Sequence, residues 1–166
     1  NWRLTTDQGT EITARVIVVA AGGGSFVPKK PHLEGLEAFE DKSVFYAVRK
    51  METFRDKRIV IAGGGDSALD WALNLHPVAK HVTIVHHRDG FRAAPASVEQ
   101  MRALVDAGEM DFNIAQLAGV NGADGQLESV RVKSKTDGES DIPADMLLPF
   151  FGLTMKLGPI AEFGLN

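Results

Sequence analysis

Apolar residues in the middle of the chain form two short runs with a helical pattern between them. Residues 59–62 are Ile-Val-Ile-Ala, and a second apolar run covers residues 81–85. Short runs of this kind are typical of buried strands. The residues between them repeat with helical spacing and predict one apolar helix face: Ala68, Leu69, Ala72, Leu73 and Leu75. This part of the chain is therefore predicted to be a strand–helix–strand unit.

The pattern beyond this unit predicts a second helix and further strands. The helix is expected over residues 97–107, with Ser97 and Gln100 as a capping box and Gly108 just past its end. Polar turns such as Asn121-Gly122 then separate three expected strands: 112–117, 127–132 and 145–151. The order β-α-β-α-β followed by a β-meander predicts an α/β fold, a Rossmann-like three-layer nucleotide-binding domain with a parallel sheet.

The first part of the chain has a different pattern. Extended segments are predicted at residues 2–6 and 11–19, where the apolar run 16–21 predicts a buried strand. Residues 25–42 contain two prolines, Pro28 and Pro31, and no clean periodicity, which indicates a connector between two bodies. We therefore divide the chain into 1–40, a main nucleotide-binding domain at 41–156, and 157–166.

Composition and charge exclude several classes of function. The chain has 166 residues, 44% of them hydrophobic and 24% charged, as expected of one ordinary globular domain. Its formal net charge of −4 argues against nucleic-acid or membrane-surface binding, which would need a basic face. No apolar run approaches the roughly 18 residues of a membrane-spanning helix.

The cysteine count is zero, which removes disulfides, thiolate catalysis and cysteine-based metal sites. We expect no metal site, because no two of the five histidines have a helical i, i+4 spacing with acidic support. A cysteine-free chain places no demand on redox compartment, so a cytoplasmic location is the default expectation. No residue stands out as a catalytic acid, base or nucleophile.

A glycine-rich turn follows the first apolar run. Gly63, Gly65 and Ala68 fit the pattern G-x-G-x-x-G/A, and Gly64 lies inside it. Such a turn presents backbone N–H groups at a helix N-terminus, where a pyrophosphate can be held. Because a strand precedes this turn and a helix follows it, we interpret it as a dinucleotide site.

Two polar residues belong to the same turn. Asp66 and Ser67 are expected to lie near the pyrophosphate, where the Ser67 hydroxyl can donate to phosphate oxygens. Asp66 could equally act only as a helix cap.

The segment after the second apolar run indicates which dinucleotide is preferred. An acidic residue at this place selects NAD, whereas basic residues accept the 2′-phosphate of NADP. His86 and His87 are followed here by Arg88 and Arg92, whose guanidinium groups suit a phosphate. NADP(H) is therefore the expected cofactor. Asp89 is the exception, and it could pair with an arginine instead of facing the ribose.

Simpler interpretations of these residues remain open. Arg88 and Arg92, taken alone, would fit a solvated surface turn, and only the glycine turn upstream favours a functional role. His86 fits a packing or backbone-bonding role as well as a ligand contact.

Together these residues resemble the pyridine-nucleotide domain of the thioredoxin-reductase-like flavoproteins. The resemblance covers nearly the whole chain and is carried by residues 63–68 (Gly-Gly-Gly-Asp-Ser-Ala), 70–73 (Asp-Trp-Ala-Leu) and 86–93 (His-His-Arg-Asp-Gly-Phe-Arg-Ala). Within that superfamily, the first two segments are similar to those of the ferredoxin(flavodoxin)–NADP⁺ reductases. Gly152 resembles the family's second nucleotide-facing glycine, although a simple turn would also explain it.

The resemblance implies hydride transfer from NADPH to FAD in the full-length protein, followed by electron transfer to ferredoxin or flavodoxin; it is also compatible with a homodimer. Residues 1–24 and the tail after Gly158 resemble the ends of the flavin domain, without its glycine fingerprint. We therefore expect this chain to be the NADP-binding half, inactive and free of FAD by itself.

Two departures from the family pattern matter. His87 stands where an arginine is usual, which predicts weaker or more pH-dependent NADPH binding. The redox Cys-x-x-Cys of thioredoxin reductases is absent from residues 45–50, which excludes electron transfer to thioredoxin. Two rival functions remain: a stand-alone module that senses NADP(H), and an interaction domain whose glycine turn is only structural.

Overall fold

The computed structural model describes residues 1–20, 22 and 24–162 of the chain. The chain divides into two compact units, the larger formed by Pro28–Leu153 and the smaller by Asn1–Val27 with Thr154–Asn166. Most of the predicted connector, from Pro28 onward, belongs to the larger unit.

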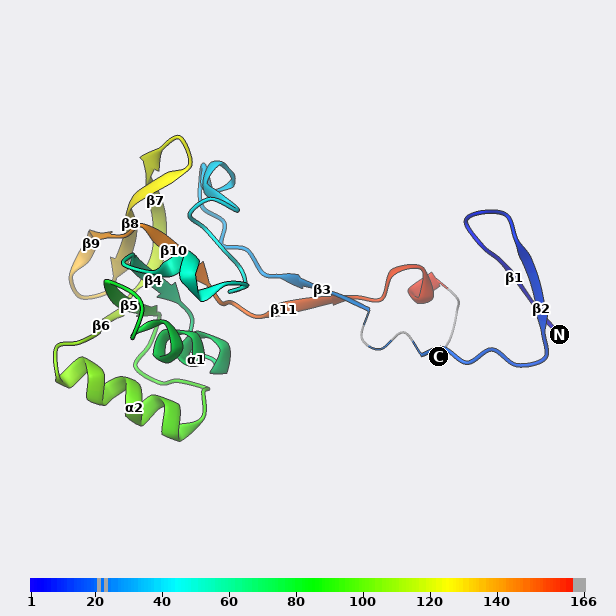
Figure 1. The fold of residues 1–166 in the computed structure, drawn as a ribbon, viewed down its shortest axis with the longest axis horizontal. Coiled ribbons are helices and arrows are strands. Elements are labelled where there is room, and N and C mark those ends of the chain that lie inside the picture. The colour runs from blue at the N-terminus through cyan, green and yellow to red at the C-terminus, as the bar shows by residue number, and fades with distance from the viewer. Residues whose placement is uncertain (21, 23, 163–166) are drawn as a thin grey trace. The chain divides into compact units, whose positions relative to one another are not determined.

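A four-stranded parallel sheet forms the centre of the larger unit (Figure 1). Its strands are β4 (Arg58–Ala62), β5 (His81–His86), β6 (Asp111–Ile114) and β10 (Met146–Pro149), in the order β10-β4-β5-β6. All three pairings are parallel. Helix α1 (Asp66–Leu75) connects β4 to β5, so the predicted strand–helix–strand unit is confirmed.

Helices cover one face of this sheet and a second sheet covers the other (Figure 1). The helical layer consists of α1 and α2 (Pro95–Asp106). The other layer is an antiparallel meander of β7 (Gln116–Ala123), β8 (Gln126–Ser134) and β9 (Gly138–Pro143). The predicted α/β class, with its three layers, parallel sheet and meander, is confirmed.

Two apolar cores lie on the two faces of the parallel sheet. Ile59 and Ile61 of β4 belong to the cluster that contains the helix residue Leu69, whereas Val60 and Ala62 belong to the cluster shared with the meander. Successive side chains of a strand point to opposite faces. A strand covered on both faces must therefore be apolar throughout, which is why this run was recognisable from the sequence.

Two short 3-10 helices precede β4 in the larger unit. They are η1 (Leu36–Phe39) and η2 (Met51–Phe54). Leu36 and Phe39 enter the core on the meander face, and Phe54 enters the core on the helix face. η1 lies in the segment predicted to be irregular, and no element was predicted at η2, because a single turn is too short to show apolar periodicity.

Helix α2 begins earlier than predicted, at Pro95. Proline suits the first position of a helix because its missing N–H would have no partner there. The predicted capping box is wrong: no side chain caps α2, and the Ser97 hydroxyl donates to Asp70 Oδ1 at 3.4 Å. Gly108 has φ 74°, as expected just past a helix end.

The strand boundaries after α2 also differ from the prediction. The strand expected over 112–117 is two strands, since β6 ends at Ile114 and β7 begins at Gln116. The strand expected over 145–151 is β10, which pairs with β4 instead of extending the meander. Asp145 precedes it and anchors it through Arg58, whose backbone N–H donates to the Asp145 carboxylate.

The turn predicted at Asn121-Gly122 is wrong, because both residues lie inside β7 at a register irregularity. The chain reverses instead at Asp124-Gly125, where φ is 54° and 79°. Positive φ at both central residues is typical of the two-residue hairpin turn that matches strand twist.

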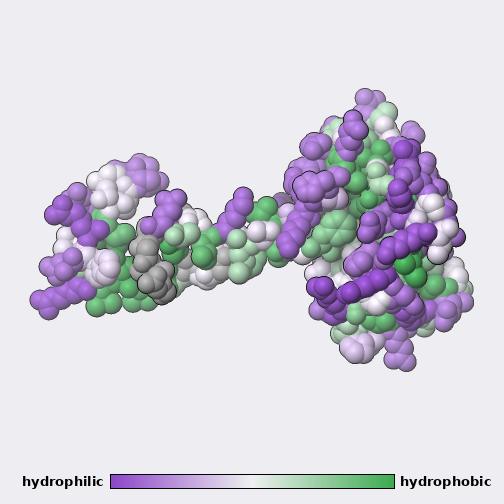
Figure 2. Space-filling view, turned by 180° about the vertical axis from the view of Figure 1, so that it is seen from behind, coloured by the Kyte–Doolittle hydropathy of each residue, from purple (hydrophilic) through white to green (hydrophobic). Residues whose placement is uncertain are grey.

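The smaller unit contains β1 (Trp2–Thr5) and β2 (Glu11–Ala14), which form an antiparallel hairpin. It also contains most of the β3 (Ser25–Pro28) and β11 (Leu153–Lys156) pair, and η3 (Gly158–Glu162). Figure 2 shows apolar side chains on its surface.

The strand predicted over residues 11–19 is shorter than expected and ends at Ala14. The apolar run after it forms no strand in the described residues, and Val16 and Val18 are 73% and 84% exposed. Among residues 16–20 there is no strand partner to bury the run. Ala21, the last residue of the predicted run, lies outside the described residues.

Candidate functional site

The glycine turn lies where the strand order of the parallel sheet reverses. From β4 the chain proceeds to β5 and then β6 on one side, and it later returns to β10 on the other side of β4. The carboxyl ends of β4 and β10 therefore border a topological switch point. Ligands of open α/β sheets bind at such points, because the flanking loops diverge there.

Two of the three glycines have steric reasons to be glycine. Gly63 has φ 152°, and a Cβ on it would lie 2.6 Å from the Phe150 carbonyl oxygen. A Cβ on Gly64 would fall on the imidazole of His86. Gly65 differs, since it has φ −101° and no heavy atom lies within 4 Å of its Cβ position. Gly65 therefore leaves open space where a ligand could approach the backbone.

The turn also leaves backbone donors free at the start of α1. The first helical bonds run from the N–H groups of Ala68 and Leu69 to the Gly65 carbonyl. Within the described part of the chain, the N–H groups of residues 64–67 donate to no protein acceptor. Unpaired N–H groups and the positive end of the helix dipole together favour an anion.

The Asp66 carboxylate does not cap α1 but accepts a hydrogen bond from another part of the chain. Its Oδ1 accepts a hydrogen bond from the Ala94 N–H at 2.8 Å, just before α2 begins. Asp66 therefore ties the starts of the two helices together, a role that sequence reasoning missed. Ser67 is exposed in the first turn of α1, and Ala68 is buried against the sheet.

One open cleft of about 520 Å³ joins most of the predicted site. It lies at the carboxyl ends of β4, β5 and β10, entirely within the larger unit. Eight predicted residues line it: Gly63, Gly64, Gly65, His86, His87, Arg88, Arg92 and Gly152. Asp66, Ser67 and Ala68 do not line it. The glycine turn and the basic segment, which are separate in sequence, thus face the same space.

The basic segment, residues 86–92, is fixed to the glycine turn by its backbone. The Arg92 N–H donates to the Gly64 carbonyl at 2.7 Å. The Nε of Arg88 donates to the Gly90 carbonyl at 3.1 Å, which orients the guanidinium group. Among the described residues, no acidic side chain pairs with Arg88 or Arg92. Both charges are therefore available to an anion in the cleft.

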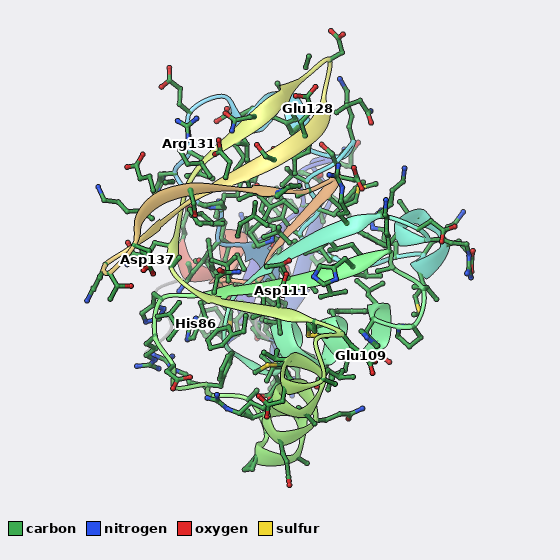
Figure 3. All side chains as sticks on the ribbon, turned by 90° about the vertical axis from the view of Figure 1, so that its left-hand side faces the viewer. His86, Glu109, Asp111, Glu128, Arg131 and Asp137 are labelled. Atoms are coloured by element: carbon green, nitrogen blue, oxygen red, sulfur yellow. The ribbon has the colours of Figure 1, made fainter. Side chains whose placement is uncertain are left out.

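His86 has a packing and backbone-bonding role. Its side chain is buried at the end of β5 (Figure 3), 5.3 Å between ring centroids from Phe91. Its Nε2 lies 3.2 Å from the Gly90 carbonyl, which can only accept, so Nε2 carries the proton. Burial lowers the pKa of His86, and the neighbouring His87 lowers it further. His86 is therefore neutral near pH 7 and supports the loop through its donor.

Asp89 does not oppose the arginines in the cleft. Its carboxylate accepts a hydrogen bond from Arg102 of α2, with Nη2 at 2.8 Å from Oδ1. Asp89 is absent from the cleft lining, whereas Arg88 and Arg92 belong to it. Of the two alternatives for Asp89, the structure therefore shows pairing with an arginine, although Arg102 was not singled out from the sequence.

Gly152, which also lines the cleft, follows β10 and adopts φ 90°. Its carbonyl oxygen accepts a hydrogen bond from the Lys29 N–H at 2.9 Å. No atom lies within 4 Å of its Cβ position, so its backbone conformation, and not crowding, favours glycine.

Sequence reasoning missed three further parts of the cleft wall. They are Pro31, His32 and Leu33 from the connector; Ala115, with Gln116 and Leu117 at the start of β7; and Phe150 and Phe151 after β10. None of these segments carries a chemical motif. The only available signal was topological, because Phe150 and Gln116 follow strands that end at the same edge of the sheet as β4.

The fold and the cleft define a Rossmann-like α/β protein with a glycine turn at the switch point of its sheet. Over residues 2–165 the chain matches the family described as pyridine nucleotide-disulphide oxidoreductase. The chain belongs to this family.

Relatives with known names confirm the resemblance drawn from the sequence. The chain is 61% identical to the ferredoxin–NADP reductase of Beijerinckia indica over 100% of this chain and 48% of the relative. It is 60% identical to the ferredoxin–NADP reductase of Bradyrhizobium sp. strain BTAi1 over 99% of this chain and 48% of the relative. The chain therefore spans about half the length of these curated relatives.

Solved structures are similar in fold. The crystal structure of thioredoxin reductase from Lactococcus lactis has a TM-score of 0.74 and 28% identity, over 85% of this chain and 46% of that one. The thioredoxin reductase of Streptococcus pyogenes has the same TM-score and coverage with 24% identity. The fold is thus thioredoxin-reductase-like, while the chain itself contains no cysteine.

In residues 1–20, 22 and 24–162, no helix has the length and apolarity needed to cross a membrane. Over the same residues, no three metal-ligating side chains come together as a candidate metal site.

Proposed function

We propose that the cleft binds NADPH and that this chain is the NADP(H)-binding part of a flavin-dependent ferredoxin or flavodoxin–NADP⁺ reductase. One observation carries the proposal: the glycine turn and two arginines without acidic partners line the same cleft at the switch point of the sheet. That combination matches the two anionic groups of NADPH, its pyrophosphate and its 2′-phosphate.

Each part of the cleft has a separate role in this proposal. The free N–H groups of residues 64–67 bind the pyrophosphate, and the open space at Gly65 allows close approach. Arg88 and Arg92 bind the 2′-phosphate, with Arg88 oriented through its Nε by the Gly90 carbonyl. Gly152, which also lines the cleft, faces the remainder of the nucleotide.

The full-length protein is proposed to complete the reaction. Bound FAD would accept hydride from NADPH and pass electrons to ferredoxin or flavodoxin, which is chemistry supplied by the cofactors. The names of the two ferredoxin–NADP reductases compared with the chain above support this assignment. The contribution of the present chain is to bind and orient NADPH, since the described residues that line its cleft include no carboxylate to pair with a histidine for proton transfer.

The domain assignment follows from the same proposal. Residues 1–40 and 157–166 are assigned to the flavin domain and its connector, and 41–156 to the nucleotide domain. The exposed apolar residues of the smaller unit support this, because such a surface needs a covering partner. A homodimer and a cytoplasmic location of the full-length protein remain predictions.

Calorimetric titration of the chain with NADPH and with NADH tests the proposal. We expect NADPH to bind more tightly, and to raise the unfolding free energy by about 2.7 kcal/mol at 100 times its Kd. Absence of binding by both nucleotides would refute a nucleotide site. Equal affinity for both would refute the role of Arg88 and Arg92. If NADPH binds but the full-length protein transfers no hydride to FAD, the rival interpretation as an NADP(H) sensor is favoured.

A further inference from the structure

Asp89 presents a conflict within the basic segment. A carboxylate just after the second strand of this fold normally selects NAD, because it bonds the ribose 2′-hydroxyl and repels a 2′-phosphate. Asp89 stands at that place, between Arg88 and Arg92. A free carboxylate there would oppose the binding of NADPH. The structure shows how this conflict is resolved.

One nitrogen atom of Arg102 holds both the side chain and the backbone of Asp89. Its Nη2 lies 2.8 Å from Asp89 Oδ1 and 3.0 Å from the Asp89 carbonyl oxygen. The two bonds orient the carboxylate and pair it with the guanidinium group. Arg88 and Arg92 line the cleft, whereas Asp89 does not. The basic segment therefore exposes two positive side chains to the cleft and keeps its negative side chain out of it.

Arg102 is itself held in place by the core. The preceding residue, Met101, is fully buried, which fixes α2 against the sheet. The guanidinium carbon of Arg102 lies 5.9 Å from the centroid of the Phe91 ring. Phe91 packs on Phe112, with 5.1 Å between ring centroids. The position of the guanidinium group is therefore set by packing that does not depend on a bound nucleotide.

We propose that Arg102 is a positioning residue for cofactor selection: it holds Asp89 so that the cleft prefers NADPH over NADH. The inference rests on the proposed nucleotide site and adds a residue that does not touch the nucleotide. Selectivity then depends on two elements, the arginines that attract the 2′-phosphate and the pair that restrains the opposing carboxylate. Such restraint of an unfavourable group is a recognised source of specificity.

The test compares Kd values for NADPH and NADH in four forms of the chain: wild type, Arg102→Met, Asp89→Asn and the double variant. Methionine preserves the apolar packing over Phe91 but removes the charge and both hydrogen bonds. We expect Arg102→Met to lower the preference for NADPH by about three- to fivefold, the upper range of one exposed charge interaction. Asp89→Asn alone should change the preference by less than about twofold, because the carboxylate is already paired with Arg102 and does not line the cleft.

The double variant separates this mechanism from a general charge effect. If Arg102 acts through Asp89, then Asp89→Asn restores the preference of Arg102→Met to within about twofold of wild type. If the two single effects simply add, Arg102 contributes only long-range charge and the proposal is overturned. Equal weakening of NADPH and NADH by Arg102→Met would also overturn it, because that result indicates a purely structural role.

Arg131→Met provides a matched control. Arg131 lies on β8 of the meander (Figure 3), pairs with Asp141 at 3.3 Å, and has a side chain exposed to the same 45% as that of Arg102. Its loss should leave the preference unchanged. If Arg102→Met proves unstable by circular dichroism, Arg102→Gln replaces it with the same expected direction.

The nucleotide affinities of the wild type distinguish failure of the proposed function from failure of the proposed role of Arg102. If the wild type binds neither nucleotide, or shows no preference for NADPH, the proposed function fails. If the wild type prefers NADPH and Arg102→Met retains that preference, only the role of Arg102 fails.

Discussion

The imidazole of His86 occupies the space beside Gly64 in which the Cβ of any other residue would lie. The end of β5 therefore packs directly on the glycine turn after β4. The same imidazole bonds to the Gly90 carbonyl, so one buried side chain contacts both the glycine turn and the basic segment.

This packing predicts that Gly64→Ala destabilises the protein. The added methyl group must displace the imidazole, and overpacking of this kind costs about 1–3 kcal/mol. Chemical denaturation of the wild type and the variant measures the loss. In the background His86→Ala the same glycine substitution should cost much less, since the obstacle is gone. Equal cost in both backgrounds would contradict the steric explanation.

Gly65→Ala should weaken NADPH binding while changing the stability of the fold only slightly. Gly65 has φ −101° and open space at its Cβ position, so alanine fits the backbone and the loss of stability should stay below about 1 kcal/mol. The methyl group would, however, stand between the pyrophosphate and the turn. We expect NADPH affinity to fall by about tenfold or more in calorimetric titration, for a loss of about 1.4 kcal/mol. Unchanged affinity would place the nucleotide away from Gly65.

Arg88→Ala should weaken NADPH binding by roughly 1–3 kcal/mol through loss of a charge-assisted contact, and leave NADH binding nearly unchanged. Parallel titrations with the two nucleotides measure the difference. Arg55→Ala is a suitable control, because Arg55 is an exposed arginine that pairs with Glu52 and does not line the cleft. Similar losses for both nucleotides would argue against a 2′-phosphate contact.

The features of the site that were predictable from the sequence are local. Gly63 to Ala68 lie within one turn, and Arg88 follows the end of one strand, so a short pattern contains each of them. The switch-point topology then brings the two patterns to one cleft. The rest of the wall was not predictable, because Leu33 and Gln116 reach the cleft only through the tertiary fold and carry no motif.

Two errors show the limit of local patterns in physical terms. The run containing Val16 and Val18 is apolar enough for a buried strand, yet burial also requires a neighbouring strand, and none among the described residues supplies it. Ser97 has the spacing of a helix cap, but Pro95 starts the helix earlier and a bond to Asp70 is available. In both cases tertiary contacts decide between local alternatives.

The ion pair of Arg58 and Asp145 predicts a pH-dependent contribution to stability. Arg58 Nη2 lies 2.6 Å from Asp145 Oδ1, and the Arg58 backbone N–H donates to Oδ2 at 2.8 Å, which joins β4 to the start of β10. Hydrogen bonds from the Arg58 side chain lower the pKa of Asp145 below its ordinary value of 3.8. The unfolded chain therefore takes up this proton at higher pH than the folded chain. The contribution of the ion pair to the free energy of unfolding is complete above about pH 4, and it is lost as the pH falls through the folded-state pKa of Asp145.

Asp145→Asn should thus lower the unfolding free energy by about 1 kcal/mol at pH 7, after allowance for solvent screening of a partly exposed pair. The difference from wild type should shrink as the pH falls below about 4 and through the folded-state pKa of Asp145, because the wild-type carboxyl group then becomes protonated as well. Urea denaturation at a series of pH values measures it. Asp141→Asn serves as the control, because its partner Arg131 lies on the exposed meander and the pair is longer, at 3.3 Å. A difference for Asp145→Asn that stayed constant from pH 7 to pH 2 would show that the charge of Asp145 is not what stabilises the junction of β4 and β10.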